Sequence, residues 1–428
     1  MNESCTIELF AQGRWTEIAS VSLFGPKAAG WRAKTYSGYD VQWAINHDGK
    51  RDAWALCSAF PVSLEPMELP HWPVFLVDML PQGYGRRELL RQLALPETLD
   101  ESGDWPLLLA GAGNPIGHLR VKEAAHWLRG KAGPRQGFTE EEVAQRSDQF
   151  IEYLSGHGLF VAGSSGVQGE WPKVLLTRAK DGLLYLDHTL DDEDAQEHFI
   201  VKFGRGPSAD LARILRHEAP YMALAELLGL RVHGKLRLLQ QALFIPRFDR
   251  EIQDGVVVRL AQESIATLTG KVGFEQVPSH NEVCRRLAAV ATNPLAEVLE
   301  YIKRDVANLA LGNKDNHARN TAVQRRFDGR IGLTPLYDFA PMYMHPDGIA
   351  RRIRWEGNDA GAPDWGRVLD TVAQDCGLDR PTLAQGLREM APKLQAVLDQ
   401  GLTMGMEPDV LTFLAPGISR QAAALASL

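Results

Sequence analysis

A polar loop between residues 312 and 320 carries the side chains best suited to chemistry. It reads Gly312-Asn-Lys-Asp-Asn-His-Ala-Arg-Asn320, with an acid at Asp315 and an amide at Asn320. An Asp followed five residues later by an Asn is the spacing of a kinase catalytic loop, in which the Asp accepts a hydroxyl proton and the Asn binds magnesium. Both residue types are also common in turns, so the pair alone leaves a structural interpretation open.

A second acid, Asp338, follows a predicted hairpin that starts at the same loop. Residues 321–324 and 331–336 have strand character and are joined across Asp328-Gly329, a strong turn signal. A hairpin returns the chain to its start, so we expect Asn320 and Asp338 at one end, beside Asp315. Converging oxygen ligands suit Mg²⁺. Asp338-Phe339-Ala340 also has the Asp-Phe form of a kinase metal-binding triplet, with Ala in place of Gly.

A lysine and a glutamate earlier in the chain suggest a phosphate-binding ion pair. Lys202 interrupts the apolar strand 198–203, where a lysine is costly unless it meets an anion. Glu218 falls within the apolar stripe of the next predicted helix, 209–228, and needs a cation. Pro220 is expected to kink that helix and makes the direction of Glu218 less certain. An edge-strand lysine that reaches water is the alternative interpretation.

A glycine-rich loop precedes these elements. Residues 163–172 read Gly163-Ser-Ser-Gly-Val-Gln-Gly-Glu-Trp-Pro172 and lead into strands 173–177 and 183–187, which are joined across Asp181-Gly182. The backbone amides of such a loop can line an anion site. The loop alone is equally typical of an ordinary turn, and only its position before the lysine strand favours phosphate binding.

Length and composition indicate an ordinary globular protein of two or three lobes. The chain has 428 residues, 45% of them hydrophobic and 23% charged. The segment 129–137 is rich in glycine, proline and basic residues and is the best linker candidate. Short strands and helices precede it, including helices at 73–80 and 88–93 around a break at 81–85. Beyond about residue 255 we expect mainly helices, of which the clearest runs from Pro294 to Leu311 and stops at Gly312.

The remaining composition excludes some classes of protein. A net charge of −8 argues against a surface devoted to nucleic acid. The cluster Arg351, Arg352 and Arg354 suits a salt-bridged strand, or alternatively a local phosphate contact. The four cysteines lack metal-site spacing and are expected to be reduced thiols. No apolar run is long enough to span a bilayer and the N-terminus lacks signal-peptide features, so a cytoplasmic location without membrane association is the default expectation.

Taken in order, several motifs resemble the HipA family of bacterial serine/threonine kinases, the toxins of HipBA-type toxin–antitoxin modules. They are Gly166-Val-Gln168, Phe199-Ile-Val-Lys202-Phe203, Arg247-Phe-Asp-Arg250, the 312–320 loop and Leu333-Thr-Pro-Leu-Tyr-Asp338. The resemblance covers most of the chain, and its length and motif order look closest to the long, solitary HipA-like toxins of the YjjJ type.

The resemblance implies an α+β, two-lobed kinase-like fold. Its parts would be an N-terminal mixed α/β subdomain at 1–128, a kinase N-lobe at 138–250 and a mainly helical C-lobe at 251–428. It implies ATP and Mg²⁺ as cofactors, Asp315 as catalytic base, and Asn320 and Asp338 as metal ligands. The ATP-binding residues that it implies are Lys202, Glu218, Ser165, Gly166, Val167, Gln168, Pro246, Arg247, Phe248, His317 and Asn320.

The resemblance also implies binding partners, and several alternative functions stay open beside it. It implies a protein substrate and a HipB-like helix-turn-helix antitoxin, with DNA association only through that antitoxin. The serine that HipA kinases typically autophosphorylate is replaced by Gly163, so this modification is either absent here or moved to Ser164 or Ser165. The alternatives are a small-molecule or lipid kinase, a metal-dependent nuclease that uses Asp315, His317 and Asp338, and a non-catalytic module that binds an antitoxin or DNA.

Overall fold

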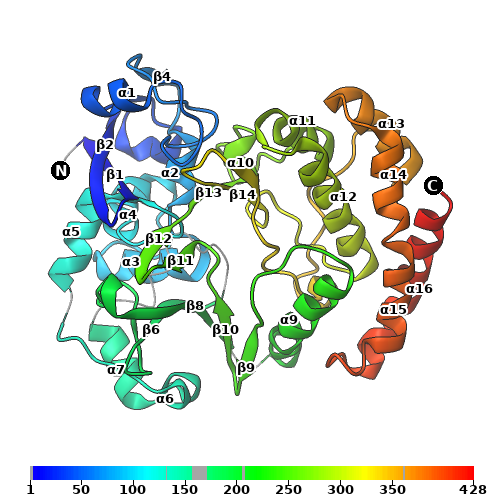
Figure 1. Ribbon diagram of the computed structural model, residues 1–428. Helices are drawn as coiled ribbons and strands as arrows, with labels where there is room; N and C mark the ends of the chain where they lie inside the picture. Colours follow the sequence, from blue (N-terminus) through cyan, green and yellow to red (C-terminus); the bar gives the residue numbers. More distant parts are fainter. Residues whose placement is uncertain (1–2, 132, 157–170, 205–207, 360–361) are drawn as a thin grey trace. The chain divides into compact units, whose positions relative to one another are not determined.

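The computed structural model describes residues 3–131, 133–156, 171–204, 208–359 and 362–428, which form two compact units (Figure 1). Unit 1 comprises Met1–Arg205, Arg237–Glu263 and Arg325–Gly329, and unit 2 comprises Gly206–Leu236, Ser264–Gln324 and Arg330–Leu428. Sheets and helices both occur, so the predicted α+β class is confirmed. The division at 1–128, 138–250 and 251–428 stays a prediction.

The first sheet of unit 1 is antiparallel, with the strand order β4-β3-β2-β1-β5. Its strands are β1 (Ser4–Ala11), β2 (Arg14–Leu23), β3 (Thr35–Tyr39), β4 (Met67–Leu69) and β5 (Leu119–Val121). Gln12 and Gly13 join β1 to β2 with φ of 52° and 76°. Two successive positive φ values match the right-handed twist of a hairpin, and glycine adopts them without strain.

A second antiparallel sheet, of order β7-β6-β8-β10-β9, carries the predicted lysine strand. Its strands are β6 (Lys173–Ala179), β7 (Leu184–Leu186), β8 (Ala195–Phe203), β9 (Arg237–Leu239) and β10 (Ala242–Pro246), and β11 (Arg250–Gln253) pairs with β12 (Val256–Arg259). The hairpin predicted across Asp181-Gly182 is confirmed, with Gly182 at a φ of 86°.

The α-helices of unit 1 precede the strands of the second sheet in the sequence. They are α1 (Val41–His47), α2 (Val74–Asp78), α3 (Gly83–Gln92), α4 (Asp104–Gly111), α5 (Lys122–Lys131), α6 (Glu140–Gln145) and α7 (Asp148–Gly156), with 3-10 turns η1 (Lys27–Arg32), η2 (Glu101–Gly103) and η3 (Asp192–Asp194). A break between two helices was expected at 81–85. The break ends earlier than that, because α3 begins at Gly83 and buries Gly85. The start of the expected linker is helical, since α5 continues to Lys131.

Unit 2 is mainly helical, as expected. Its elements are α9 (Ala209–Leu227), α10 (Ile265–Leu268), α11 (His280–Val290), α12 (Pro294–Ala310), α13 (Trp365–Cys376), α14 (Arg380–Arg388), α15 (Ala391–Gln400) and α16 (Pro408–Ala426), with the turn η4 (Met342–Met344). The helix predicted at 209–228 is confirmed to within one residue, and it includes Pro220. Figure 1 shows α14 next to α12. Helix α16 also packs against α12, and all three helices share one apolar core.

Helix α12 positions the polar loop. The side chain of Asn293 caps its first turn by accepting the Ala296 N–H at 3.2 Å, and Pro294 occupies the first turn, where no N–H is needed. Val298, Ile302 and Val306 recur at helical spacing and are fully buried. The helix predicted at 294–311 is therefore confirmed to within one residue.

A small sheet of order β13-β14-β15 follows the polar loop. Its strands are β13 (Ala261–Ser264), β14 (Ala322–Arg325) and β15 (Ile331–Leu333), and the Thr334 N–H donates to the Ala322 carbonyl at 2.9 Å. The predicted hairpin around Asp328-Gly329 is confirmed. Among the described residues, no helix is both long and apolar enough to cross a membrane.

Candidate active site

Gly312 turns the chain from α12 into the polar loop. Its φ is +67°, and a Cβ built there would lie 2.7 Å from Cδ1 of Tyr343. Any side chain would therefore be strained and would clash. The Tyr343 N–H also donates to the Gly312 carbonyl at 3.1 Å. Glycine at this position allows the η4 turn to pack directly on the start of the loop.

Asp315 and Asn320 are held together by the loop itself. The Asn320 amide nitrogen, Nδ2, donates to the Asp315 carbonyl at 2.8 Å. On the other side, the Asp315 N–H donates to Oδ1 of Asn313 at 3.3 Å, and Asn313 Nδ2 donates to Asn308 Oδ1 at 2.9 Å. Because the nitrogen of Asn320 is engaged, its orientation is fixed, and its oxygen is the end suited to a hard cation.

His317 lies beside the candidate base. Its Nε2 atom is 3.8 Å from Asp315 Oδ1, and its Nδ1 accepts the Arg319 N–H at 3.2 Å. An accepting Nδ1 places the proton of the neutral ring on Nε2. Burial lowers the pKa of His317, although the charges of Asp315 and Asp338 oppose the effect. The ring is therefore neutral near pH 7.

Asp338 leaves the β14–β15 hairpin in a left-handed backbone conformation, with φ of 52°. Few non-glycine residues adopt this conformation, which costs free energy and is concentrated at functional sites. The neighbouring Tyr337 hydroxyl donates to the Arg319 carbonyl at 2.9 Å and so fastens this segment to the polar loop.

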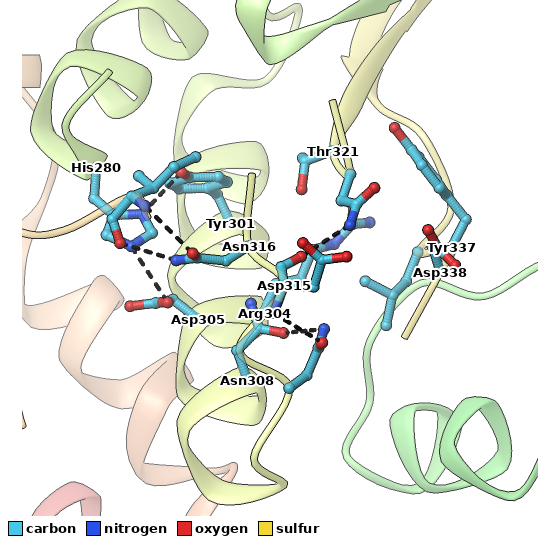
Figure 2. A pocket seen from close by; sticks show the side chains of 14 residues that line it. His280, Tyr301, Arg304, Asp305, Asn308, Asp315, Asn316, Thr321, Tyr337 and Asp338 are labelled. Atoms are coloured by element: carbon cyan, nitrogen blue, oxygen red, sulfur yellow. Dashed lines mark hydrogen bonds and ion pairs between the residues drawn. The ribbon is translucent and has the colours of Figure 1, made fainter. Parts of the chain in front are cut away.

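One pocket brings the three predicted residues together. Asp315, Asn320 and Asp338 all line it, as Figure 2 shows for the two acids. Its volume is about 30 Å³, enough for an ion or a water molecule but not for a nucleotide. All of the lining residues belong to unit 2. The structure thus places the predicted residues in one site, while their roles remain predictions.

The side chains of this pocket would supply only part of the coordination shell of Mg²⁺, and a bound ligand and water would supply the rest. Asn320 supplies an amide oxygen and Asp338 a carboxylate, and Mg²⁺ completes its shell with water and phosphate oxygens. No group of three or more His, Cys, Asp or Glu side chains in the described part of the chain is arranged to hold a metal. The ligand set that a nuclease would draw from Asp315, His317 and Asp338 is therefore not found.

The floor of the pocket is a buried ionic network that the sequence analysis missed. Asp305, on α12, accepts from Arg351 Nη2 at 2.6 Å and Trp355 Nε1 at 2.9 Å, and it lies 3.3 Å from His280 Nε2 (Figure 2 draws Asp305 and His280). Burial alone would raise the pKa of Asp305, but His280 and Arg351 outweigh it and hold the pKa below its usual range. An acid within the apolar stripe of α12 was the available signal.

Lys202 and Glu218 are both buried, but they belong to different units. Lys202, on β8, is 3% exposed, lies opposite Leu243 of β10, and has its ammonium 5.3 Å from the centroid of the Trp171 ring. Glu218, on α9, is 1% exposed. A buried lysine argues against the alternative of an amine that simply reaches water. The ion pair between the two side chains stays a prediction.

The predicted adenine-binding segment, Pro246 to Phe248, is attached to a buried charge cluster. Arg247 is fully buried, and its Nε and Nη2 atoms donate to Asp249 at 2.9 and 2.7 Å. Its Nη1 lies 3.3 Å from Asp187. Its backbone N–H donates to the His198 carbonyl at 2.9 Å. Arg247 is therefore engaged in the sheet and the cluster, and backbone groups of Pro246 and Phe248 are left as the candidates for adenine.

The predicted phosphate loop lies outside the described residues. This holds for Gly163, for the candidate modification sites Ser164 and Ser165, and for Gly166, Val167 and Gln168. The basic cluster is described, and it is ion-paired: Arg351 binds Asp305 and Asp359, while Arg352 and Arg354 lie 3.6 and 3.8 Å from Glu275 and Asp359.

Comparison with known proteins assigns the chain to a family. A family model described as the HipA-like C-terminal domain matches residues 165–398, more than half of the sequence. The chain belongs to this HipA-like family. The matched region contains the polar loop, Asp338, Lys202 and the Arg247 segment, so the recognition made from those motifs is confirmed.

One named relative accompanies the HipA-like assignment. Over 242 residues the chain is 26% identical to a protein named "Putative kinase Y4mE" from Sinorhizobium fredii (strain NBRC 101917 / NGR234), and the match covers 53% of each. The chain therefore spans about half the length of that relative.

A solved structure supports the fold across the whole chain. The protein is similar to a chain of the Shewanella oneidensis MR-1 toxin–antitoxin complex of HipA, HipB and operator DNA, with a TM-score of 0.67 at 20% identity. The superposition covers 99% of this chain and 97% of that one. At this identity the likeness establishes a HipA-like fold.

Proposed function

We propose that this chain is an ATP- and magnesium-dependent serine/threonine protein kinase of the HipA type, and that it inhibits growth as a toxin. The observation that carries the proposal is the convergence of Asp315, Asn320 and Asp338 on one pocket of unit 2. Their order and spacing are those of a kinase catalytic loop followed by a metal-binding Asp. The HipA-like family and the relative named as a putative kinase support it.

In this proposal Asp315 accepts the proton of the acceptor hydroxyl as phosphoryl transfer begins. His317 stays neutral because its pKa is lowered, so it does not form a charged pair with the base. Asn320 and Asp338 would hold magnesium, and their attachment through the Asp315 carbonyl and the Tyr337 hydroxyl keeps them in place. Bound magnesium would neutralise negative charge on the phosphates.

The nucleotide is assigned to the residues that the resemblance names, among them Lys202, Glu218, His317 and Asn320. Lys202 would pair with ATP phosphates and Glu218 would orient it, as in other kinases. The carbonyl of Pro246 and the N–H of Phe248 would bind adenine. The burial of Lys202 and the anchoring of Arg247 support this assignment, because a buried cation and a fixed backbone are both suited to an anionic nucleotide.

The toxin role and the partners rest on the family. The structural neighbour is a HipA in complex with HipB and operator DNA. By analogy, a HipB-like helix-turn-helix antitoxin would bind this chain and connect it to DNA, and the substrate would be a cytoplasmic protein. Because a fold does not determine a substrate, each of these assignments requires its own test.

The test is transfer of label from γ-labelled ATP in a cell extract stripped of its own kinases, followed by separation into protein, lipid and small-molecule fractions. Magnesium-dependent label on serine or threonine with the wild type, and none with Asp315→Asn, is expected. Label in the lipid or small-molecule fraction would support the alternative kinases. Growth inhibition that persists in Asp315→Asn without any labelling would support a non-catalytic binding module.

A further inference from the structure

An extended segment beside the catalytic loop, residues 351–355, alternates between buried and exposed side chains. Ile353 and Trp355 are 4% and 3% exposed, whereas the side chains of Arg352 and Arg354 are 41% and 51% exposed. The segment has the side-chain alternation of a strand, yet it is assigned to no sheet. Its backbone must therefore be held by something other than a neighbouring strand.

Asn316 takes the place of that neighbouring strand. Its Oδ1 accepts the N–H groups of Arg352 at 2.7 Å and Ile353 at 3.3 Å, and its Nδ2 donates to the Ile353 carbonyl at 2.9 Å. A side-chain amide that bonds both N–H and C=O groups reproduces the pairing of a β-ladder. Asn316 directly follows Asp315, so these three bonds connect the segment to the residue next to the candidate base.

Other contacts fix the segment to α11 and α12. Arg351 pairs with Asp305 on α12, and its Nη1 donates to both carboxylate oxygens of Asp359 at 2.7 Å. The Arg354 carbonyl accepts the first N–H of α11, from His280, at 2.9 Å. The segment is therefore held both by these helices and by Asn316, and the Asn316 bonds link its backbone to the catalytic loop.

We propose that Asn316 is a positioning residue that makes the 351–355 segment the acceptor-side wall of the pocket. This inference rests on the proposed function, because it takes Asp315 as the base. An acceptor hydroxyl must come within hydrogen-bond distance of Asp315, so it meets the groups that surround Asp315. Asn316 and Ile353 are among them. Of the residues assigned to ATP, Asn320 also lines this pocket, whereas Lys202 and Pro246 to Phe248 do not.

The first test is limited digestion with trypsin, which cleaves after Arg352 and Arg354. Proteolysis follows the population of the opened segment when opening is fast. Because Asn316→Ala removes all three bonds, we expect cleavage at these two sites to accelerate about tenfold or more. Asn316→Asp keeps the accepting oxygen and loses the donor, so an intermediate increase of about threefold is expected.

Asn358→Ala is the matched control. Asn358 also bonds backbone groups on both sides of its amide, the Asp364 N–H at 3.0 Å and the Asp364 carbonyl at 2.9 Å, but it does not contact the catalytic loop. We expect cleavage after Arg352 and Arg354 at the wild-type rate in this variant. Wild-type cleavage in Asn316→Ala would overturn the proposal. If Asn316→Ala fails to fold, wild-type cleavage in Asn316→Asp would overturn it.

The second test separates positioning from general stability. We measure the affinity for a fluorescent ATP analogue and the KM for dephosphorylated casein as a general acceptor. In Asn316→Ala the KM for casein should rise about tenfold while nucleotide affinity changes less than about twofold, and Asn316→Asp should restore part of the KM. Equal losses of both affinities would overturn the positioning role. A wild type that transfers no phosphate to any acceptor would refute the proposed function instead, and digestion would still decide whether Asn316 holds the segment.

Discussion

Arg325 is the side chain whose loss should destabilise unit 1 most sharply. It is fully buried at the end of β14, and its Nε lies 3.0 Å from Oε2 of Glu263. Its two Nη atoms donate to the carbonyls of Asp52, Ala55 and Leu56. One guanidinium thus joins the loop at 52–56 to two strands of the small sheet.

The expected magnitude follows from what Arg325→Met leaves behind. Glu263 is 3% exposed and would keep hydrogen bonds from the Ser58 N–H, at 2.8 Å, and the Ser58 hydroxyl, but would lose its guanidinium partner. Removing one member of a buried ion pair costs about 3–5 kcal/mol, because the remaining charge is uncompensated. That is a large share of the roughly 5–15 kcal/mol that stabilises a typical domain. Adding Glu263→Gln should recover part of the loss, since the orphaned charge is removed.

Urea unfolding monitored by tryptophan fluorescence measures this free energy of unfolding. Arg326→Met is the matched control, because the neighbouring Arg326 pairs with Glu251 at a position where both side chains are about 30% exposed. Such pairs contribute under about 1 kcal/mol. Similar losses of free energy for Arg325→Met and Arg326→Met, or a double variant less stable than Arg325→Met alone, would refute the reasoning.

Three further predictions concern single residues. The left-handed φ of Asp338 implies that Asp338→Gly changes the free energy of unfolding by less than about 1 kcal/mol while Asp338→Val costs about 1–2 kcal/mol, and both should lose phosphotransfer; equal stability of the two in thermal melts would contradict this. Burial, with a smaller contribution from Arg325, lowers the pKa of His118 from 6.5 to about 3. Between those pH values only the unfolded state takes up the proton. The free energy of unfolding should therefore fall by up to about 1.4 kcal/mol per pH unit as the pH drops below 6.5. The amide of His118→Gln can still donate to the Ala53 carbonyl, and this variant should flatten that slope in urea titrations at pH 5 and 7. Lys202→Met should weaken binding of a fluorescent ATP analogue by about tenfold or more, and unchanged affinity would remove Lys202 from the nucleotide site.

Single helices and hairpins could be predicted because the residues that specify them lie within a few positions of one another in the sequence. The caps and apolar spacing of α12, the Asp-Gly turns of the two hairpins and the Gly312 stop all act within a few residues, and all are found in the structure. Pro220 shows where such reasoning stays incomplete. It lies inside α9, which runs from Ala209 to Leu227, and the kink expected there stays a prediction.

The convergence of Asp315, Asn320 and Asp338 was predictable from the hairpin that separates them. Their surroundings were not. Asn316 looked like one polar loop residue among several, and its partners at 352 and 353 are remote in sequence. Arg325 and Glu263 likewise are far apart in the chain from Ser58 and Asp52. Buried ionic contacts between distant segments leave no periodic signal in a sequence.

The central claim is tested most directly by the rate of magnesium-dependent transfer of γ-phosphate to protein, measured in parallel for the wild type, Asp315→Asn and Asp347→Asn. Asp347 is an exposed acid outside the pocket and serves as the control. Removing a general base costs about 10²- to 10⁴-fold in rate. A loss of that size in Asp315→Asn alone, with nucleotide affinity retained, is the predicted result. Transfer at the wild-type rate in Asp315→Asn, or no magnesium-dependent transfer in the wild type, would contradict the account.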